Sequence, residues 1–291
     1  MRQIANHWKD YECIDAGGGE KLERWGDIIL RRPDPQAMWP IADEGGLWRK
    51  SHAVYHRSKA GGGDWELRKS FPEFWTINFN ELTFKVSPTG FKHTGLFPEQ
   101  AVNWEWMQEK IRNAKREIRV LNLFAYTGGA TMACAAAGAS EVVHVDASKG
   151  MVAWAKENMA LSKLDDAHIR FIIDDVLKFV AREERRGRTY HAIIMDPPSY
   201  GRGPNGEIWK LEDQLYELVE ACAKILDPEP LFFCVNAYTT GFSSIVLENI
   251  LEMSLRPRFP KAQISAGEIG LPISHSGWIL PCGIYGRMSL K

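Results

Sequence analysis

The feature that most constrains the fold is an alternation of short apolar runs with helical stretches, which begins near residue 101. The apolar runs predict strands at 119–124, 141–146, 169–173, 192–195 and 231–235. The stretches between and after them predict helices at 104–116, 130–137, 149–161, 176–184 and 211–226. Strands joined by crossover helices run parallel, and a parallel sheet is covered on both faces, so its strands are continuously apolar. The alternation therefore predicts an α/β domain with an open, doubly wound and mainly parallel sheet.

The end of the chain departs from this alternation. Residues 261–269 and 278–288 predict two strands with no helix between them. We expect these strands to form an antiparallel hairpin at one edge, which brings the sheet to seven strands. Ligands of such sheets bind at the carboxyl ends of the strands, near the point where the strand order reverses, so candidate functional residues are sought there.

The first third of the chain has a different texture. Seven of the eleven tryptophans precede residue 105, and glycine triplets at 17–19 and 61–63 separate short β-prone runs. Such glycines supply the positive φ angles of hairpin turns, so we expect a small, mainly-β domain at 1–88 and the α/β domain at 89–291. We expect the tryptophans to pack in the core of the small domain, with base stacking as the alternative.

Composition excludes several classes of protein. The formal net charge is −1 at pH 7, so an RNA or DNA partner must be bound by a local patch rather than by a global basic field. The five cysteines are odd in number and form no CxxC pair, so we expect neither a disulfide framework nor a zinc site. This pattern indicates a protein of the reducing cytoplasm. No run approaches the ~18 apolar residues of a membrane span, so we expect a protein that is neither exported nor embedded.

Two glycines follow the first predicted strand. In the run Phe124-Ala125-Tyr126-Thr127-Gly128-Gly129 they allow a tight turn in which the backbone approaches a ligand, and the next helix offers its N-terminal N–H groups. The run is not GxGxxG, so it suits a nucleoside with a charged amino-acid tail better than a dinucleotide. A plain strand-to-helix turn is the alternative. The second strand ends in Asp146, whose carboxylate can accept hydrogen bonds from both hydroxyls of a ribose.

The third and fourth strands also end in acidic residues. Asp175 can accept a hydrogen bond from an adenine amino group, with a helix N-cap as the alternative. The run Asp196-Pro197-Pro198-Ser199-Tyr200 contains two prolines, which leave backbone carbonyls without ladder partners beside a carboxylate. The ring of Tyr200 can lie against a planar base. A simple turn is the alternative interpretation of this motif.

In this order, these signals resemble the class I S-adenosylmethionine-dependent methyltransferases, and more closely the bacterial large-subunit rRNA base methyltransferases with an Asp-Pro-Pro-x-aromatic motif. The resemblance covers about residues 90–291 and rests on motifs at 93–100, 121–129, 143–148, 174–176 and 196–200. It implies a Rossmann-like methyltransferase fold, S-adenosylmethionine as the cofactor and an RNA substrate.

The same resemblance implies roles for individual residues. Tyr126 to Gly129 would surround the methionine end of the cofactor, Asp146 would hold the ribose and Asp175 the adenine. The implied cofactor residues are Phe124, Tyr126, Thr127, Gly128, Gly129, Asp146, Asp175 and Gln100. The implied catalytic residues, on the side of methyl transfer, are Asp196, Pro197 and Tyr200. No metal is required.

One departure from that family bears on the mechanism. Members that methylate cytosine C5 carry a cysteine nucleophile at the end of the fifth strand, because the ring carbon needs covalent activation. Cys234 lies one position earlier, and a shift of one residue on a strand turns the side chain to the opposite face. We therefore expect a buried thiol and direct attack of a base atom on the sulfonium methyl group, with covalent catalysis by Cys234 as the alternative. Asn236 lies at the strand end instead and could hydrogen-bond a base edge.

Other functions stay open at this point. An NAD-dependent oxidoreductase would share the fold and Asp146, but the chain lacks the three-glycine turn. A catalytically silent nucleic-acid-binding relative and a methyltransferase acting on a small molecule or a protein are further alternatives. Basic residues gather at 110–119 and 182–188, where we expect solvated helix surfaces, with phosphate contacts as the alternative.

Overall fold

The computed structural model describes residues 1–41, 46–58, 62–90, 92–203, 205–239 and 241–290. The chain divides into two compact units. The α/β unit comprises Met1–Arg2, Asn103–Glu268 and Gly283–Lys291, and the β unit comprises Gln3–Val102 and Ile269–Cys282. The β unit therefore includes a segment from near the carboxyl end of the chain, and the expected limits of 1–88 and 89–291 stay a prediction.

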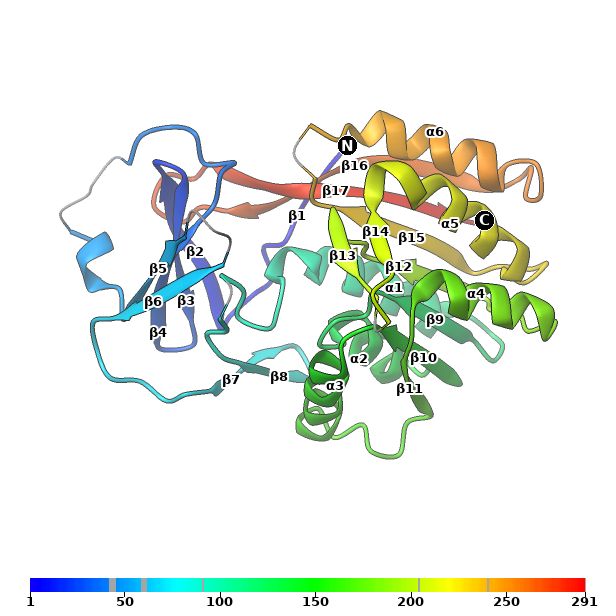
Figure 1. The fold of residues 1–291 in the computed structure, drawn as a ribbon, viewed down its shortest axis with the longest axis horizontal. Helices are drawn as coiled ribbons and strands as arrows, with labels where there is room; N and C mark the ends of the chain where they lie inside the picture. The colour runs from blue at the N-terminus through cyan, green and yellow to red at the C-terminus, as the bar shows by residue number, and fades with distance from the viewer. Residues whose placement is uncertain (42–45, 59–61, 91, 204, 240, 291) are drawn as a thin grey trace. The chain divides into compact units, whose positions relative to one another are not determined.

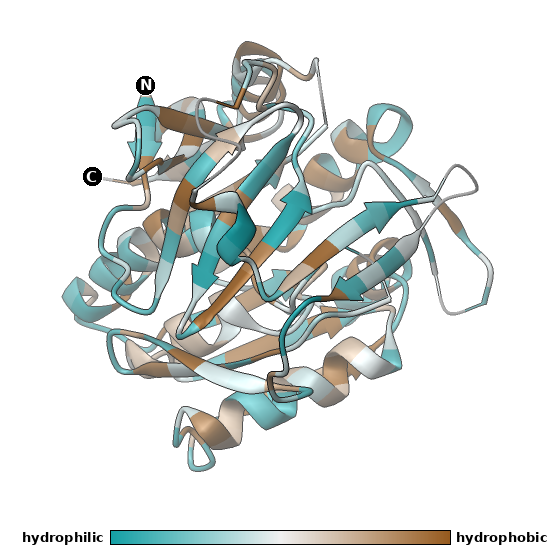
Figure 2. Cartoon of the chain, turned by 90° about the vertical axis from the view of Figure 1, so that its left-hand side faces the viewer, coloured by the Kyte–Doolittle hydropathy of each residue, from teal (hydrophilic) through white to brown (hydrophobic). Residues whose placement is uncertain are grey.

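The β unit has the mainly-β structure that its glycine triplets predict. Its five-stranded sheet follows the order β2 (Tyr11–Gly17), β3 (Glu20–Trp25), β4 (Ile28–Pro33), β5 (Ala53–Arg57) and β6 (Gly63–Leu67). A separate hairpin and two 3-10 helices complete it: β7 (Trp75–Phe79), β8 (Leu82–Val86), η1 (Trp48–Lys50) and η2 (Pro98–Gln100). Hydrophobic and hydrophilic residues alternate along several strands in Figure 2, and burial alternates in the same way along β4 and β8.

The tryptophans of the β unit belong to its framework. Trp25 and Trp48 are fully buried, and the Tyr11 ring lies 4.7 Å from the Trp25 ring. The Trp48 indole donates to Asp15, and four other indoles, those of Trp8, Trp39, Trp65 and Trp75, donate to backbone carbonyls of the same unit. An indole whose ring packs inside the unit and whose N–H donates to the same unit stabilises the fold. The packing interpretation is therefore favoured over base stacking.

The α/β unit is organised around one eight-stranded sheet in the order β1-β16-β17-β15-β12-β9-β10-β11 (Figure 1). The strands are β1 (Arg2–Ile4), β9 (Arg119–Leu123), β10 (Glu141–Asp146), β11 (Ile169–Ile173), β12 (Ala192–Met195), β15 (Phe232–Ala237), β16 (Gln263–Pro272) and β17 (Ile279–Ser289). β9, β10, β11, β12 and β15 pair in parallel, whereas β17 runs antiparallel to β15. The doubly wound sheet is therefore confirmed, and β1 adds an eighth strand beyond the seven expected.

Within the described ranges, six helices cover the two faces of this sheet. They are α1 (Ala101–Asn113), α2 (Gly129–Ala136), α3 (Lys149–Leu161), α4 (Val176–Arg185), α5 (Leu211–Ile225) and α6 (Ser244–Leu255). Odd-numbered residues of β12 and β15, such as Ile193 and Val235, pack with α4, α5 and α6. Their even-numbered neighbours, such as Ile194 and Cys234, pack with α1 and α2. Each face thus has its own apolar core, which is why these strands contain no polar alternation. No helix among the described residues is long and apolar enough to cross a membrane.

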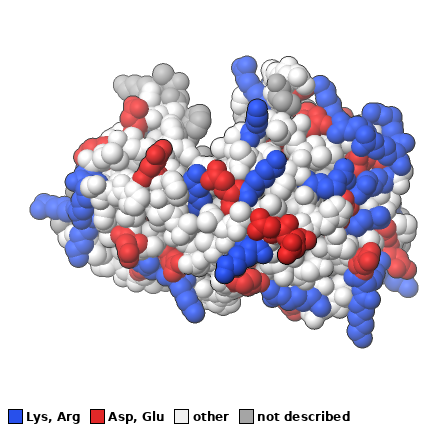
Figure 3. Space-filling model, turned by 90° about the horizontal axis from the view of Figure 1, so that it is seen from below, with Lys and Arg blue, Asp and Glu red and all other residues white. Residues whose placement is uncertain are grey.

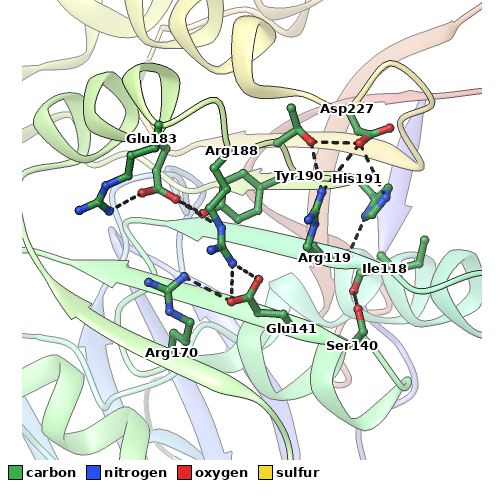
Figure 4. Close-up of polar contacts among 12 residues, drawn as sticks. Ile118, Arg119, Ser140, Glu141, Arg170, Glu183, Arg188, Tyr190, His191 and Asp227 are labelled. Atoms are coloured by element: carbon green, nitrogen blue, oxygen red, sulfur yellow. Dashed lines mark hydrogen bonds and ion pairs between the residues drawn. The ribbon is translucent and has the colours of Figure 1, made fainter.

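Ion pairs tie helix α4 to the amino-terminal edge of the sheet (Figure 4). Glu183, on α4, is fully buried and accepts hydrogen bonds from the Tyr190 hydroxyl at 2.6 Å and from Arg186 at 2.9 Å. Arg188 lies 3.6 Å from Glu183 and also pairs with Glu141, the first residue of β10. Two of the four arginines at 182–188, Arg186 and Arg188, therefore form ion pairs at the edge opposite the strand carboxyl ends.

We predict that this network contributes measurably to stability. Glu183→Ala leaves the buried Tyr190 hydroxyl and its arginine partners without their carboxylate, so the free energy of unfolding should fall by about 3 kcal/mol or more. Tyr190→Phe, which removes one hydroxyl, should cost about 1 kcal/mol. Denaturant unfolding followed by circular dichroism measures both. Equal stability of Glu183→Ala and the wild type would contradict a stabilising role.

Candidate active site

The carboxyl ends of the parallel strands lie in register. Leu123 pairs with Val145 on one side and with Met195 on the other, and Met195 pairs with Val235. The residues that follow this row, one on each strand, are Phe124, Asp146, Asp196 and Asn236. Neighbouring strands lie about 4.8 Å apart, so the register alone brings three predicted site residues and one polar neighbour to a single edge.

The loop after β9 has a strained backbone. Phe124 and Tyr126 have φ angles of 53° and 51°, in the left-handed region that bulky residues rarely adopt. Each such residue costs about 1–3 kcal/mol and persists only where its surroundings enforce it. Here the Tyr126 N–H donates to Asp146 Oδ2 at 2.8 Å, and Asn158 Nδ2 donates to the Thr127 carbonyl at 2.9 Å. Strands β9 and β10 and helix α3 therefore hold this loop in one conformation.

The two glycines of the loop are required by packing. Gly128 has a φ of 85°, and a Cβ placed on it would lie 3.2 Å from Ala155 Cβ of helix α3. A Cβ on Gly129 would lie 2.6 Å from the ring of Trp104 on helix α1. The glycines thus allow the start of α2 to approach both neighbouring helices. This packing does not exclude a ligand role, because the N-terminus of a helix favours an anion.

Asp146 is held by the backbone around it. Its Oδ1 accepts from the Ser148 N–H and its Oδ2 from the Tyr126 N–H, each at 2.8 Å. Burial raises the pKa of this carboxyl above its ordinary value, while the two backbone donors oppose the increase. An ionised carboxylate has about four acceptor positions, so two donors leave capacity for the hydroxyls of a ribose.

Asp175 is the N-cap of helix α4. Its side chain accepts from the Lys178 N–H at 3.0 Å, so the capping interpretation describes its contact in this structure. The preceding Asp174 pairs with Arg182 at 2.6 Å. The expected contact of Asp175 with adenine stays a prediction.

The Asp-Pro-Pro run leads from β12 into a short hairpin that the sequence pattern does not predict. Strands β13 (Tyr200–Arg202) and β14 (Ile208–Lys210) form it, with Tyr200 exposed on β13. Asp196 is partly buried and Pro197 is buried. The Pro198 carbonyl accepts from the Trp209 indole at 2.7 Å, so its partner lies outside the strand ladder.

Several residues near these strand ends were not expected from the sequence. Trp209, on β14, also packs its ring 4.9 Å from the Phe124 ring, so it links the loop after β9 to the Asp-Pro-Pro run. His144 lies buried on β10, 2.9 Å from the Thr131 hydroxyl, and burial lowers its pKa to about 3, which keeps the ring neutral. Asn103, on α1, donates to Asn236 at 2.7 Å. Trp209 and Asn103 stand in no motif, and His144 stands in the 143–148 motif without an expected role, so only their three-dimensional neighbours reveal these contacts.

Gln100 belongs to the β unit rather than to the α/β unit. It ends η2 and is buried. Its contact with the cofactor stays a prediction. Among the described parts of the chain, no three His, Cys, Asp or Glu side chains are grouped so that they could hold a metal ion.

Cys234 is a fully buried free thiol, as the register argument predicts. Burial raises the pKa of the thiol to about 12, although the neighbouring Arg287 guanidinium lowers it in part. The side chain packs in the core on the side of α1 and α2, together with Ile194 and Phe232. A thiol in that environment is inert as a nucleophile at neutral pH.

Several of the basic residues at 110–119 have partners among the described residues. At the end of α1, Arg116 pairs with Glu229, and Lys110 donates to Ser289. Acidic and basic side chains are interspersed on the face shown in Figure 3. The solvated or paired interpretation of both basic groups is therefore favoured over a continuous phosphate-binding surface.

Comparisons with known proteins identify the family. The model of the S-adenosylmethionine-dependent methyltransferases matches residues 46–255, most of the chain, and the chain therefore belongs to this family. It is similar to a SAM-dependent methyltransferase from Agrobacterium tumefaciens of known crystal structure, with a TM-score of 0.94 and 37% identity over 100% of this chain and 94% of that one. A protein described as a methyltransferase and solved with SAH shares the fold, with a TM-score of 0.72 and 19% identity over 97% of this chain and 76% of its own.

A curated relative acts on ribosomal RNA. The ribosomal RNA large subunit methyltransferase K/L of Shewanella frigidimarina is 34% identical over 146 residues, which are 50% of this chain and 20% of that protein. A second protein of that name, from Magnetococcus marinus, is 29% identical over 69% of this chain and 27% of its own length. The chain thus spans about a quarter or less of these relatives. The family and the S-adenosylmethionine cofactor are established by these matches.

We predict that Cys234 takes no part in the chemistry. With a thiol pKa of about 12, only about one molecule in 10⁵ carries the thiolate at pH 7. Cys234→Ala should therefore retain methyl transfer in single-turnover assays. Cys222→Ala, which removes another fully buried thiol, controls for the cavity. A denaturation-resistant adduct between Cys234 and an RNA containing 5-fluorocytosine would show instead that the enzyme methylates cytosine C5.

Proposed function

We propose that the chain methylates a base of ribosomal RNA in the cytoplasm, by direct attack of a base nitrogen on the methyl group of S-adenosylmethionine. The observation that carries the proposal is the shared edge of Asp146, which ends β10, and Asp196, which follows β12, on either side of the loop after β9. One carboxylate is placed for a ribose and the other for an acceptor group. An NAD-dependent oxidoreductase would give Asp196-Pro197 no role.

On the cofactor side, the chain supplies a fixed backbone and a carboxylate. Asp146 accepts from the ribose hydroxyls while it keeps the Tyr126 N–H in place, so cofactor binding and loop conformation depend on one side chain. Tyr126, Thr127, Gly128 and Gly129 surround the methionine end, and Phe124 closes the loop against Trp209. Asp175 accepts from the adenine amino group. S-adenosylmethionine, when bound, supplies an electrophilic methyl group on a sulfonium.

On the acceptor side, Asp196 and the Pro197 carbonyl accept hydrogen bonds from the base, and the Tyr200 ring stacks on it. These contacts orient the attacking nitrogen in line with the C–S bond. The nitrogen lone pair forms the new N–C bond, the electrons of the C–S bond return to sulfur, and the surplus proton of the nitrogen passes to Asp196. Buried Cys234 offers no covalent route, which supports this direct transfer.

The ribosomal substrate rests on the relatives named for it. A small molecule or a protein as acceptor is the competing proposal. Nucleoside mass spectrometry of rRNA and tRNA from cells with and without the gene decides between them. A methylated nucleoside that is absent from the rRNA of the deletion strain supports the proposal, and identical RNA from both strains contradicts it.

One prediction of the proposed function concerns the cofactor. Asp146→Ala removes the acceptor of two ribose hydroxyls and the hydrogen bond that holds Tyr126, so S-adenosylmethionine binding should weaken by roughly 2–4 kcal/mol. Titration calorimetry measures the change. Asp165→Ala, which removes an exposed carboxylate from the loop before β11, is the matched control for loss of charge. Unchanged affinity in a folded Asp146→Ala protein would remove this residue from the cofactor site.

The second prediction concerns the acceptor. Asp196→Ala should abolish transfer in single-turnover assays and leave cofactor affinity within about tenfold, because the residue orients the acceptor rather than the cofactor. Asp196→Asn keeps one acceptor oxygen and should retain part of the rate. Near-normal turnover of Asp196→Ala would mean that the Asp-Pro-Pro run is only a turn.

A further inference from the structure

A buried arginine lies on β17, as the register partner of Cys234, close to the strand ends that carry Asp196 and Asn236. These two strand ends are called the acceptor edge below. Arg287, on β17, lies between two aromatic rings, with its guanidinium carbon 4.7 Å from the Trp106 ring centre and 4.6 Å from that of Tyr285. Only a small fraction of its surface is exposed. Burying a guanidinium costs several kcal/mol, whereas an apolar side chain would fill the same space without that cost. Its hydrogen bonds therefore merit a functional explanation.

The guanidinium begins a chain of side-chain hydrogen bonds. Its Nε donates to Asn103 Oδ1 at 3.0 Å, and its Nη2 donates to the same oxygen at 2.5 Å. Asn103 Nδ2 in turn donates to Asn236 Oδ1 at 2.7 Å. The three residues come from β17, α1 and the end of β15, and all belong to the α/β unit.

The direction of this chain is determined by its first member. A guanidinium is a donor only, so the oxygen of Asn103 must face Arg287 and the amide nitrogen of Asn103 must face Asn236. Asn236 must then turn its own oxygen toward Asn103. Its Nδ2 is left on the other side of the amide. Arg287 thus orients two amides that would otherwise be free to exchange oxygen and nitrogen.

The Asn236 amide stands next to Asp196. Val235 pairs with Met195, and Asn236 and Asp196 are the next residues on these neighbouring parallel strands. Asn236 follows Cys234 on the sheet face that α1 and α2 cover, and Ile194 of β12 lies on that face as well. A fixed N–H donor near the end of β15 and a carboxylate acceptor directly after β12 therefore lie on adjacent strands, whose spacing is about 4.8 Å.

We propose that Arg287 is a positioning residue that, through Asn103, holds the Asn236 amide as a donor beside Asp196, so that the two side chains together recognise the Watson–Crick edge of a base. Every base presents an N–H next to a hydrogen-bond acceptor on that edge, whereas on the major-groove edge only adenine does. Such a pair matches a carboxylate next to an amide N–H. The C5 edge of a pyrimidine does not present this pair. The inference rests on the proposed function and specifies its acceptor: a nitrogen on the Watson–Crick edge.

The decisive test compares variants that change the chain of hydrogen bonds at one point each. Arg287→Met removes the donor at its origin, and Arg287→Lys keeps a charged donor. Asn103→Asp keeps the oxygen that faces Arg287 and removes the donor to Asn236. Asn236→Asp keeps the oxygen that faces Asn103 and replaces the donor that faces the acceptor.

Two quantities are measured for each variant: kcat/KM with in vitro transcribed large-subunit rRNA as the probe, and the S-adenosylmethionine Kd by calorimetry. Arg287→Met, Asn103→Asp and Asn236→Asp should each lower kcat/KM by about ten- to hundredfold, the range of one well-oriented base contact. The Kd for S-adenosylmethionine should stay within about threefold of the wild-type value, because none of the hydrogen bonds that link Arg287, Asn103 and Asn236 involves the loop after β9. Arg287→Lys should recover most of the activity lost in Arg287→Met.

The outcomes separate this inference from the proposed function. Wild-type kcat/KM in Arg287→Met, or a parallel loss of S-adenosylmethionine affinity that Arg287→Lys does not restore, would overturn the positioning role while RNA methylation stands. Primer extension on the methylated rRNA should stop at the product if a ring nitrogen carries the methyl group, whereas a methylated exocyclic amino group still pairs and is identified by nucleoside mass spectrometry. Full read-through with a methyl group mapped to C5 would also overturn it. Wild-type enzyme that binds S-adenosylmethionine but methylates no RNA would overturn the proposed function itself.

Discussion

The register of the parallel strands is the constraint on which the candidate site depends. Because Leu123, Val145, Met195 and Val235 lie in one row, the residues that follow them come to one level on four neighbouring strands. A shift of one residue on any of these strands would turn the following residue to the opposite face. The continuous apolar packing of both faces prevents that shift. The core and the site are thus specified by the same residues.

The loop after β9 depends on that register in turn. Two aromatic residues adopt the left-handed backbone, and the hydrogen bond from Tyr126 to Asp146 crosses from one strand end to the next. Asp146 is therefore a folding residue as well as a candidate ligand residue. A loop that is already strained into shape loses little conformational entropy when a ligand binds, so its strain is a cost of folding rather than of binding.

The sequence predicts most of the large sheet because strands buried on both faces are long apolar runs with a clear signal. Three elements gave no such signal: β1 has only three residues, the β13–β14 hairpin pairs three residues with three, and α6 follows a turn beyond the last predicted parallel strand. Asp175 shows a different limit of sequence-based prediction. An acidic residue before an apolar one is compatible with a helix N-cap and with an adenine contact, so the pattern does not distinguish them. Trp209 and Asn103 could not be predicted, because their partners are distant in sequence.

The two sides of the acceptor edge illustrate how burial separates possible chemistries. Cys234 and Arg287 are register partners on β15 and β17, yet the first is a thiol that burial holds protonated and the second a cation that lies between two aromatic rings and donates to the Asn103 oxygen. A covalent mechanism would need the thiolate, whose charge the same surroundings disfavour. Recognition by hydrogen bonds needs only a donor of fixed direction, and a permanently charged guanidinium supplies one at any physiological pH. Burial at this point of the fold thus disfavours a thiolate nucleophile and is compatible with hydrogen-bond donors of fixed direction.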